Sequence, residues 1–357
     1  MRTQRTVTLT LEHQAPIAHL PKSPQQLQQQ AASNDTVTIN HWRQIWLDNS
    51  RENKRIFGSF KDNGAHVLHQ TNLHKPAIII GSGPSLKHYA KHLVAHDEPG
   101  KNPDGSDRVT KYEGNPGIMT LSALHNYGFL EDLGVKVDYY VSLDAGEIVI
   151  NEMFEGGTNS KEFYCERSKD KTLIAYMGTN PKLWENWKGK VLFVNSVTPD
   201  DSFNAELDAI EPYAFSVSSG GNVLGAAFYL AKAVMGSNPI IFMGADFSFG
   251  YENNFHSWKS PYDVMGHTTK HVDIYGNSVR SWPSYTNFKS WFEQKAATVP
   301  GTYINCSDGI FGSYPEGNWI GVQQKHIEEA LEAYRVSSRL KPMIDDVTVR
   351  QIPLVLF

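Results

Sequence analysis

The chain has 357 residues, and its 33 basic against 38 acidic side chains give a formal net charge of −5. A composition of 40% apolar and 11% aromatic residues is typical of a globular protein and excludes an intrinsically disordered one. The near balance of charge disfavours non-specific wrapping of nucleic acid, which needs a strongly basic surface, and leaves only a local basic groove open.

No segment approaches the roughly 18 consecutive apolar residues of a membrane-spanning helix, so no contact with a membrane is expected. The first residues include Arg2 and Arg5 without an apolar stretch after them, and therefore do not resemble a secretory signal. Cys165 and Cys306 lie too far apart in sequence to indicate a metal-binding box or a disulfide framework. We therefore expect a cytoplasmic protein.

Short apolar runs alternate with helical patterns along the chain. Ala77-Ile78-Ile79-Ile80 is a continuous apolar run, which is typical of a buried parallel strand. Residues 97–117 are rich in Pro, Gly and Asp and indicate a long surface loop. Strands that alternate with helices predict an α/β fold with a Rossmann-like, doubly wound, mostly parallel sheet and helical flanking segments. Further strands are expected at 138–143, 173–176, 191–195 and 239–246, and helices at 39–57, 121–133, 221–235 and 323–335.

The glycines suggest where the core begins and ends. All 28 lie between Gly58 and Gly321, which indicates a turn-rich core with two flanks of different character. We therefore divide the chain into four parts. They are a flexible N-terminal arm over 1–35 with a candidate strand at 6–11, a helical lead-in over 36–74, a Rossmann-like domain over 75–330 and a C-terminal tail over 331–357.

The first motif that points to chemistry is Gly81-Ser82-Gly83-Pro84-Ser85, directly after the strand at 77–80. Ligands of doubly wound sheets bind outside the carboxyl ends of the strands. The glycines let backbone N–H groups approach an anion, Pro84 suits a first helical turn and Ser85 can cap a helix, so the motif predicts a phosphate contact. It lacks the lysine of a P-loop and the third glycine of the dinucleotide fingerprint. A plain strand-to-helix turn is the alternative.

Two further motifs also follow strands. Asp144 ends the strand at 138–143, with Glu147 close behind it. A carboxylate there can accept a hydrogen bond from a ribose hydroxyl or hold a divalent cation, and it can equally be a helix cap. Ser218-Ser219-Gly220-Gly221-Asn222 opens the helix at 221–235, where hydroxyls and N–H groups would form a second nucleotide contact. Plain capping with close helix packing is the alternative.

The fourth motif is a strand-end carboxylate followed by aromatic and histidine residues. Asp246 ends the strand at 239–246, and after it come Tyr251, His256, His267 and His271. Such a set fits a substrate pocket with a general base. For each histidine singly, an ordinary surface or core position is the alternative.

A fifth pattern we interpret as non-functional. His88, His92 and His96 are spaced to share one helical face, but no acidic or cysteine partner lies nearby in sequence. We expect a solvated helix face here and not a metal site.

Taken in this order, the motifs resemble the DUF115 or MptE-like family. The family includes the motility accessory factor (Maf) flagellin glycosyltransferases and is distantly similar to bacterial sialyltransferases that use CMP-sialic acid. Each matching segment is short, and their common order makes the match specific. The segments run from Ile78 to Leu86, from Leu133 to Tyr139 and on to Asp144, from Ser219 to Val223, from Pro239 to Phe247 and from Ile304 to Gly312.

This resemblance implies a Rossmann-like core that binds a nucleotide-activated donor. A histidine beyond the Gly-x-Asp-Phe strand would deprotonate the acceptor hydroxyl, with His267 as the first candidate and His256 as the second. The sialyltransferases have a tyrosine directly after Asp-Phe to assist the leaving phosphate; Ser248 stands there in this chain, and Tyr251 is the candidate substitute. By the same analogy the residues against the nucleotide would be Gly81, Ser82, Gly83, Ser219 and Gly220, with Asp246 nearby.

The hypothesis we favour from the sequence is a nucleotide-sugar-dependent glycosyltransferase. The alternative within the family is the archaeal MptE reaction, in which diphosphate moves from ATP to a hydroxymethyl-dihydropterin with Mg²⁺ held by carboxylates; here Asp144, Glu147 and Asp246 are the candidate ligands. A catalytically silent nucleotide-binding module is a third reading, because Ser248 replaces the expected tyrosine. The acceptor stays open between a protein, a glycan and a modified nucleobase, and the apolar segment 352–357 is compatible with a homo-oligomer.

Overall fold

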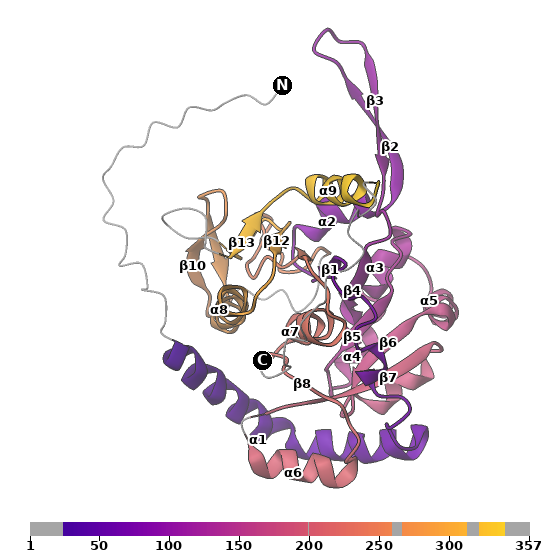
Figure 1. Cartoon of the computed structure of the whole chain (residues 1–357), viewed down its shortest axis with the longest axis vertical. Helices are drawn as coiled ribbons and strands as arrows, with labels where there is room; N and C mark the ends of the chain where they lie inside the picture. The colour runs from indigo at the N-terminus through magenta and orange to yellow at the C-terminus, as the bar shows by residue number, and fades with distance from the viewer. Residues whose placement is uncertain (1–23, 199, 259–265, 313–320, 340–357) are drawn as a thin grey trace, which may run out of the picture.

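A single large sheet organises the chain. The computed structural model describes residues 24–198, 200–258, 266–312 and 321–339. Its nine-stranded sheet has the order β13-β12-β9-β1-β4-β5-β6-β7-β8, and each neighbouring pair of strands is parallel. Helices lie on both faces (Figure 1), so the predicted doubly wound, mostly parallel α/β sheet is confirmed.

The strands of the sheet are short and apolar. In β1 every residue is fully buried, because Ile78 and Ile80 face one hydrophobic core while Ala77 and Ile79 face the other. This explains why the strand is a continuous apolar run and does not alternate with polar residues. The strands are β1 (Ala77–Ile80), β4 (Met119–Ala123), β5 (Tyr139–Ser142), β6 (Thr172–Tyr176), β7 (Lys190–Ser196), β8 (Ser216–Val217), β9 (Ile240–Met243), β12 (Tyr303–Asn305) and β13 (Val322–Gln324).

The helices divide between the two cores. One core receives side chains from α1 (Pro24–Phe57), α3 (Tyr127–Asp132) and α6 (Asp201–Ile210). The opposite core receives them from α7 (Val223–Tyr229), which continues as the π-helix η6 (Leu230–Val234), and from α8 (Pro283–Thr298). The other helices are α2 (Leu86–Tyr89), α4 (Ile148–Glu152), α5 (Lys161–Arg167) and α9 (Ile327–Arg339), with 3-10 segments η1 (Ala65–Leu68), η2 (Ala90–Leu93), η3 (Leu124–Asn126), η4 (Ser168–Asp170) and η5 (Pro181–Glu185).

The predicted flanks differ from the structure at the N-terminal side. Helix α1 begins at Pro24, so the prediction of a flexible arm is wrong for residues 24–35. Proline is well suited to the start of a helix, and the glutamines and alanines that follow it have good helix propensity. The candidate strand at 6–11 and the apolar segment at 352–357 lie outside the described residues. Within the part of the chain that is described, no helix is long and apolar enough to cross a membrane.

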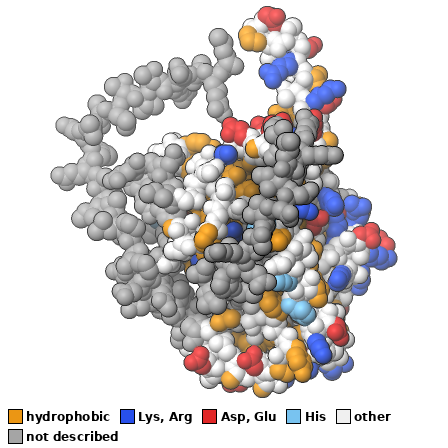
Figure 2. All heavy atoms as spheres, viewed as in Figure 1, with side chains coloured by type: hydrophobic (Ala, Val, Ile, Leu, Met, Phe, Trp, Pro, Cys, Tyr) orange, Lys and Arg blue, Asp and Glu red, His pale blue; other side chains and the backbone are white. Residues whose placement is uncertain are grey.

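The loop predicted at 97–117 is instead a β-hairpin. Strands β2 (Ala95–Lys101) and β3 (Asp107–Glu113) pair in antiparallel register, and Asn102 and Ser106 close the turn between them through backbone hydrogen bonds. The Pro-Asp-Gly sequence at 103–105 is a turn signal between two strands, which explains the difference. The hairpin projects from the body and carries both acidic and basic side chains (Figures 1 and 2).

Two other predicted helices are shorter than expected. The segment 121–133 is split into strand β4, a 3-10 turn and helix α3, because β4 pairs with β1 and β5 inside the sheet. The segment 323–335 begins as strand β13 before α9. The remaining predicted strands at 138–143, 173–176, 191–195 and 239–246 are confirmed as β5, β6, β7 and β9, and the helix at 221–235 as α7 with η6.

The direction of winding reverses at β1. The chain goes from β1 to β4 on one side, and later returns to β9 on the other side of β1. In doubly wound sheets the ligand crevice lies at such a reversal, outside the carboxyl ends of the strands. Part of this edge is already covered, because Asn49 and Asn53 of α1 donate hydrogen bonds to carbonyl groups after β5 and β6. The open part of the edge therefore lies around β1, β4 and β9.

Candidate functional site

The turn after β1 is held from both sides by other backbone segments. Gly81 and Gly83 donate amide hydrogen bonds at 2.8 and 2.9 Å to carbonyl groups at the end of β9. Ser257 donates its amide to the Ser82 carbonyl at 3.0 Å and its hydroxyl to the Gly83 carbonyl at 2.6 Å. Two of the amides expected to contact phosphate are thus already hydrogen-bonded within the protein. The nucleotide contact at this turn stays a prediction. Ser82 is partly exposed, whereas the other residues of the turn are buried.

A carboxylate lies at the start of α2, where the sequence predicted an anion. Asp246 accepts a hydrogen bond from the Ser85 hydroxyl at 2.8 Å and a longer one from the Ser85 amide at 3.4 Å. A Cβ atom on Gly83 would lie 2.2 Å from Asp246 Oδ2, so only glycine fits beside this carboxylate. Burial raises the pKa of Asp246 to about 7; Asp308 raises it further, and the Ser85 hydroxyl lowers it.

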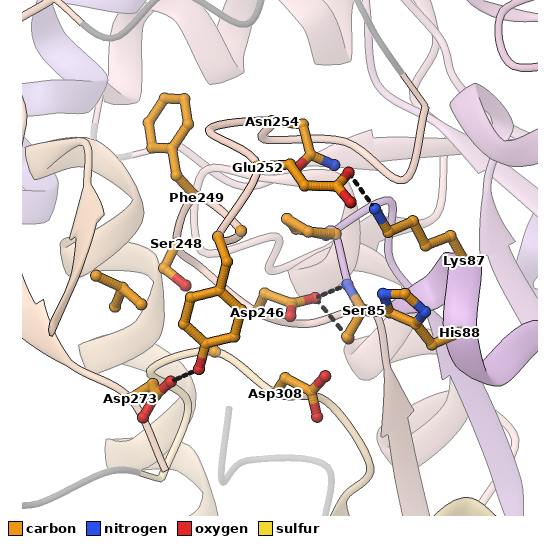
Figure 3. Close-up of a pocket in the computed structure, with 15 residues that line it drawn as sticks. Ser85, Lys87, His88, Asp246, Ser248, Phe249, Glu252, Asn254, Asp273 and Asp308 are labelled. Atoms are coloured by element: carbon orange, nitrogen blue, oxygen red, sulfur yellow. Dashed lines mark hydrogen bonds and ion pairs between the residues drawn. The ribbon is translucent and has the colours of Figure 1, made fainter. Parts of the chain in front are cut away.

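Asp246 forms one wall of a pocket between the end of β1 and the segment after β9, which we call the acidic pocket (Figure 3). Its walls carry the carboxylates of Asp246, Glu252, Asp273 and Asp308 but only one lysine, Lys87. At the rim, Lys87 is ion-paired with Glu252. The pocket coincides with the winding reversal at β1, where the topology places a ligand.

Tyrosine hydroxyl groups hold the carboxylates on the far wall of the acidic pocket. Tyr251 donates to Asp273, and Tyr275 donates to Asp308 at 2.8 Å. Tyr89 of α2 also donates to Asp308. Tyr251, a predicted catalytic residue, is 66% exposed at the pocket mouth, and burial of its hydroxyl together with the bond to Asp273 raises its pKa to about 12. Its hydroxyl is therefore a hydrogen-bond donor and remains protonated at neutral pH.

A second group of titratable side chains lies on the other side of the turn. Three carboxylates and two histidines are gathered there from the ends of β4 and β5, from α4 and the residues after it, and from the segment that follows β9. We call it the histidine–carboxylate cluster, and it consists of His125, Asp144, Glu152, Glu155 and His256.

The pair of His125 and Glu155 is the centre of this cluster. His125 Nε2 lies 2.7 Å from Glu155 Oε2, and the His125 ring centroid lies 4.7 Å from that of His256. The neighbouring Asn126 donates to the Ile80 carbonyl at 3.2 Å, which ties the end of β4 to the start of the Gly81 turn. A histidine held by a carboxylate is the arrangement that orients an imidazole for proton transfer.

Two carboxylates of the cluster have raised pKa values. Burial raises the pKa of Glu152 to about 7, and the negative charge of Asp144 raises it further. Surrounding protein atoms also raise the pKa of Asp144 while His125 lowers it, although solvent still reaches this side chain at the carboxyl edge. The pKa of Glu155 is lowered, first by its hydrogen bond with His125. The cluster therefore holds carboxylates of different acidity side by side.

The motif at 218–222 meets the first turn through α7. Leu224, in the first turn of α7, is so close to Gly81 that a Cβ atom there would lie 3.0 Å from Leu224 Cδ1. Asn222 caps α7 by accepting from the Gly225 amide at 2.9 Å. Gly220 has a φ of +59° and packs on Trp291, whose ring a Cβ atom would approach to 2.6 Å. The structure thus packs the first turn of α7, which the second glycine motif precedes, against the Gly81 turn. That both motifs contact one ligand stays a prediction.

A known protein family matches the middle of the chain. The family model described as "6-hydroxymethylpterin diphosphokinase MptE-like" matches residues 113–252. We call this matched range the MptE-like segment. The predicted resemblance is thereby confirmed over a shorter range than 75–330, and the MptE-like segment contains His125, Asp144 and Asp246.

One solved structure similar to this chain is the Maf glycosyltransferase from Magnetospirillum magneticum AMB-1. The two share 15% sequence identity with a TM-score of 0.49, over 78% of this chain and 42% of that one. The chain thus spans less than half of that protein's length. None of the curated proteins compared with the chain matches it.

Carboxylates of the MptE-like segment do not form the predicted magnesium site by themselves. Asp144 belongs to the histidine–carboxylate cluster, Asp246 is hydrogen-bonded to Ser85, and Glu147 is exposed and ion-paired with Lys182. Among the described residues, no three side chains of His, Cys, Asp or Glu are placed to hold a metal ion. Mg²⁺ in proteins is often bound by one or two carboxylates together with substrate phosphates, and Asp144 is an exposed candidate for that role.

The predicted histidines are placed differently from one another. His256 is buried in the histidine–carboxylate cluster, whereas His267 is exposed in a turn before β10 (Thr269–Val272), which pairs with β11 (Ser278–Ser281). His267 does not line the acidic pocket, and its role as a base stays a prediction. The predicted solvated face is correct only for His88, because the helix ends early and His92 is buried.

Several residues of both groups were not among the predicted site residues. His125 was assigned to a helix interior, although it follows a strand end, which is where ligand-binding residues gather. Glu152 and Glu155 lie just beyond the Asp144 motif and carry no local signal of their own. Asp308 lies within a matching segment of the family resemblance, so its strand-end position after β12 was the available signal.

Proposed function

We propose that the chain is a transferase that moves a sugar from a nucleotide-activated donor to an acceptor hydroxyl. The observation that carries this proposal is the His125–Glu155 pair, 2.7 Å apart, at the carboxyl edge of the sheet beside the turn after β1. Among the described residues, His125 Nδ1 has no hydrogen-bond partner, so it is available to a substrate. A general base in this position can deprotonate a hydroxyl bound at the edge of the sheet.

In this reaction the acceptor O–H proton passes to His125 Nδ1. The acceptor oxygen forms a bond to the anomeric carbon, and the bond from that carbon to the nucleotide phosphate breaks, with its electron pair leaving on the phosphate. Glu155 stabilises the imidazolium that forms. Glu152, with a pKa of about 7, supplies a group that can protonate the departing phosphate.

The charge of the cluster favours a donor with few phosphate charges. Its side chains are three carboxylates and two histidines, with no lysine or arginine among them. Such surroundings repel the several charges of a nucleoside triphosphate more strongly than those of a sugar nucleotide with one or two phosphates. In the donor complex, Ser219 and Gly220 at the start of α7 would contact the nucleotide, and Asp144 its ribose, as in the original expectation.

A diphosphokinase is the second candidate, and the description of the family model favours it. In that reaction the same base would deprotonate a hydroxymethyl group, which would attack the β-phosphorus of ATP and release AMP. Mg²⁺ would supply charge neutralisation for the triphosphate, and the cation would share Asp144 with the phosphates.

Thermal-shift measurements with CMP, UDP, GDP, ADP and ATP, each with and without Mg²⁺, separate the candidates. Sugar transfer predicts a higher melting temperature with one of the first three nucleotides. The corresponding nucleotide sugar should then be hydrolysed or transferred, with release of the nucleotide followed by chromatography. Stabilisation by ATP only in the presence of Mg²⁺, with AMP as the product, would instead support the diphosphokinase. If no nucleotide raises the melting temperature, both reactions lose their basis; stabilisation by a nucleotide without any turnover would instead support the silent nucleotide-binding module.

A further inference from the structure

We propose that the acidic pocket binds a primary ammonium group of a small organic molecule. The inference does not depend on the reaction proposed above, because it concerns the other side of the Gly81 turn and is tested by binding without turnover.

The walls of the acidic pocket are rich in carboxylates. Asp246 and Asp273 are each only 3% exposed, and Asp308 is half-buried beside them. Within the described structure none of the three forms an ion pair; their hydrogen bonds come from hydroxyl, amide and backbone N–H groups. Buried carboxylates are usually paired with a cation. The one lysine of the pocket does not serve them, because it is ion-paired with Glu252 at the rim.

The pocket also contains a polar side chain that does not contact the carboxylates through a hydrogen bond in the described structure. Ser248 is only 2% exposed, and in the described part of the chain its hydroxyl has no hydrogen-bond partner. In Figure 3 this hydroxyl points into the pocket. Ser248 Oγ is not one of the fully buried oxygen atoms that lack a partner in the described structure, so it stays accessible from the pocket and can hydrogen-bond a ligand atom.

The spacing of the carboxylates limits the kind of cation that they can bind together. The carboxylates are not close enough to serve as a set of metal ligands, since no group of three metal-binding side chains is found among the described residues. An ammonium group reaches carboxylates that are further apart, because each N–H donates its own hydrogen bond to one of them. Asp308 has an oxygen, Oδ2, without a hydrogen-bond partner in the described structure. Tyr251, which lines the pocket and is largely exposed, offers a ring face for the cation.

These groups define how the ligand would bind. The ammonium nitrogen would donate to Asp308 and to Asp246, two carboxylates of the same pocket, and the Ser248 hydroxyl oxygen would accept the third hydrogen bond. The attached carbon atoms would leave past Tyr251 toward solvent. Both a free alkylamine and an amino sugar present this same ammonium group, and they differ only in the hydroxyl groups around it.

The test uses the whole chain and n-butylammonium chloride as the probe, with n-butanol as its uncharged counterpart. Saturation-transfer NMR and titration by isothermal calorimetry should detect binding of n-butylammonium and none of n-butanol. Asp308→Asn should weaken n-butylammonium binding about tenfold, since it removes a charge-assisted hydrogen bond. Asp104→Asn, on the exposed hairpin turn, is the matched control and should bind like the unaltered chain.

Two further variants keep the test decisive if Asp308→Asn does not fold. Ser248→Ala should weaken binding a fewfold without changing the charge of the pocket, and so should Tyr251→Ala at the exposed mouth. A separate titration with glucosamine decides the source: tighter binding than n-butylammonium points to an amino sugar, and weaker binding to a simple amine. Equal binding of n-butanol and n-butylammonium, binding unaffected by all three variants, or no binding to the unaltered chain would overturn the proposal.

Discussion

The acidic pocket and the histidine–carboxylate cluster lie on opposite sides of one turn and compensate their carboxylates in different ways. In the cluster, the hydrogen bond from His125 lowers the pKa of Glu155, and burial raises the pKa of Asp144 while the same imidazole partly offsets that rise. In the acidic pocket, hydroxyl groups of serine and tyrosine take the place of a cation around Asp246 and Asp308. The two regions have similar numbers of carboxylates and differ in the groups that face them.

This difference separates two kinds of chemistry. A histidine near a carboxylate can take up and release a proton around neutral pH, so the cluster is suited to moving a proton to or from a substrate. A hydroxyl group hydrogen-bonds a carboxylate but leaves its charge in place, so the acidic pocket keeps a field that attracts a cation. The common turn, Gly81 to Ser85, holds the two regions at a fixed separation, because both Asp246 and Ser257 are bonded to it.

The largest expected effect is at the centre of the cluster. His125→Ala removes the proposed base, so kcat should fall roughly 10²- to 10⁴-fold. The affinity for the donor nucleotide should stay unchanged, because His125 is proposed to act on the acceptor hydroxyl. Single-turnover kinetics with the donor identified by thermal shift, together with nucleotide titration, measures the two quantities. His69→Ala, an exposed histidine outside both regions, is the control.

The same assay compares His125 with His267 as the candidate base. His267→Ala, in the exposed turn before β10, is assayed beside His125→Ala. A rate lost in His267→Ala and kept in His125→Ala would contradict the role proposed for the cluster and would return the base to the residue that the sequence favoured.

The second-largest effect is expected for a substitution in the turn between the two regions, Gly81 to Ser85. Gly83→Ala places a Cβ atom 2.2 Å from Asp246 Oδ2, and relieving this contact must displace the turn or the carboxylate. We expect a loss of about 1–3 kcal/mol in the free energy of unfolding, measured by urea denaturation. Binding of n-butylammonium and of nucleotide should both weaken, because the turn contacts both regions.

Gly266→Ala is the matched control for this substitution. No atom lies within 4 Å of a Cβ built at Gly266, so the change should be nearly neutral. A Gly83→Ala variant as stable as Gly266→Ala would mean that the turn is free to relax, and the fixed separation of the two regions would no longer hold.

A smaller effect follows from the raised pKa of Asp246. In the unfolded chain an aspartate titrates near 4, whereas burial raises the pKa of Asp246 to about 7 in the folded protein. Between these values the folded state binds the proton more tightly, so this stabilising contribution is complete below about pH 4 and is lost as the pH rises through about 7. In the unaltered chain the free energy of unfolding should therefore fall by up to about 1.4 kcal/mol per pH unit in this range, and Asp246→Asn should abolish that fall.

The free energy of unfolding of both chains, measured between about pH 5 and about pH 8, checks this prediction. Glu152→Gln tests the cluster in the same way and should give a smaller total difference, because the pKa of Glu152 rises from 4.5 to about 7 and that of Asp246 from 3.8 to about 7. Parallel pH profiles for the unaltered chain and Asp246→Asn would show that Asp246 is ionised across the range.

Much of the fold could be predicted because it depends on local apolar runs. The segments at 77–80 and 239–246 are buried on both faces of the sheet, and burial on both faces leaves a continuous hydrophobic run in the sequence. The turn at 81–85 and the carboxylate of Asp246 were also found, since both directly follow such runs. In contrast, the strand at 119–123 was read as a helix, because its pairing with β1 and β5 is decided by distant segments.

The site was predicted less completely for the same reason. His125 was hidden by the wrong assignment of its segment, although it ends up at a strand terminus. Asp273 and Asp308 enter the acidic pocket from the connection between β10 and β11 and from the loop after β12, and no local pattern shows that these two loops meet. Serine and tyrosine hydroxyls that face carboxylates are likewise brought together only by the tertiary fold.

The smallest expected effect, at the rim of the acidic pocket, tests how far its field depends on Lys87. Glu252→Gln breaks an exposed ion pair, so stability should change by less than about 1 kcal/mol. Lys87 would then be an uncompensated cation beside Asp246, and binding of n-butylammonium should weaken about two- to threefold at low salt and less at high salt. Lys87→Met should have the opposite sign, because it removes the only lysine of the pocket wall. If both variants bind n-butylammonium equally, the pocket selects by shape and hydrogen bonding and not by charge, and the contrast with the cluster loses its electrostatic basis.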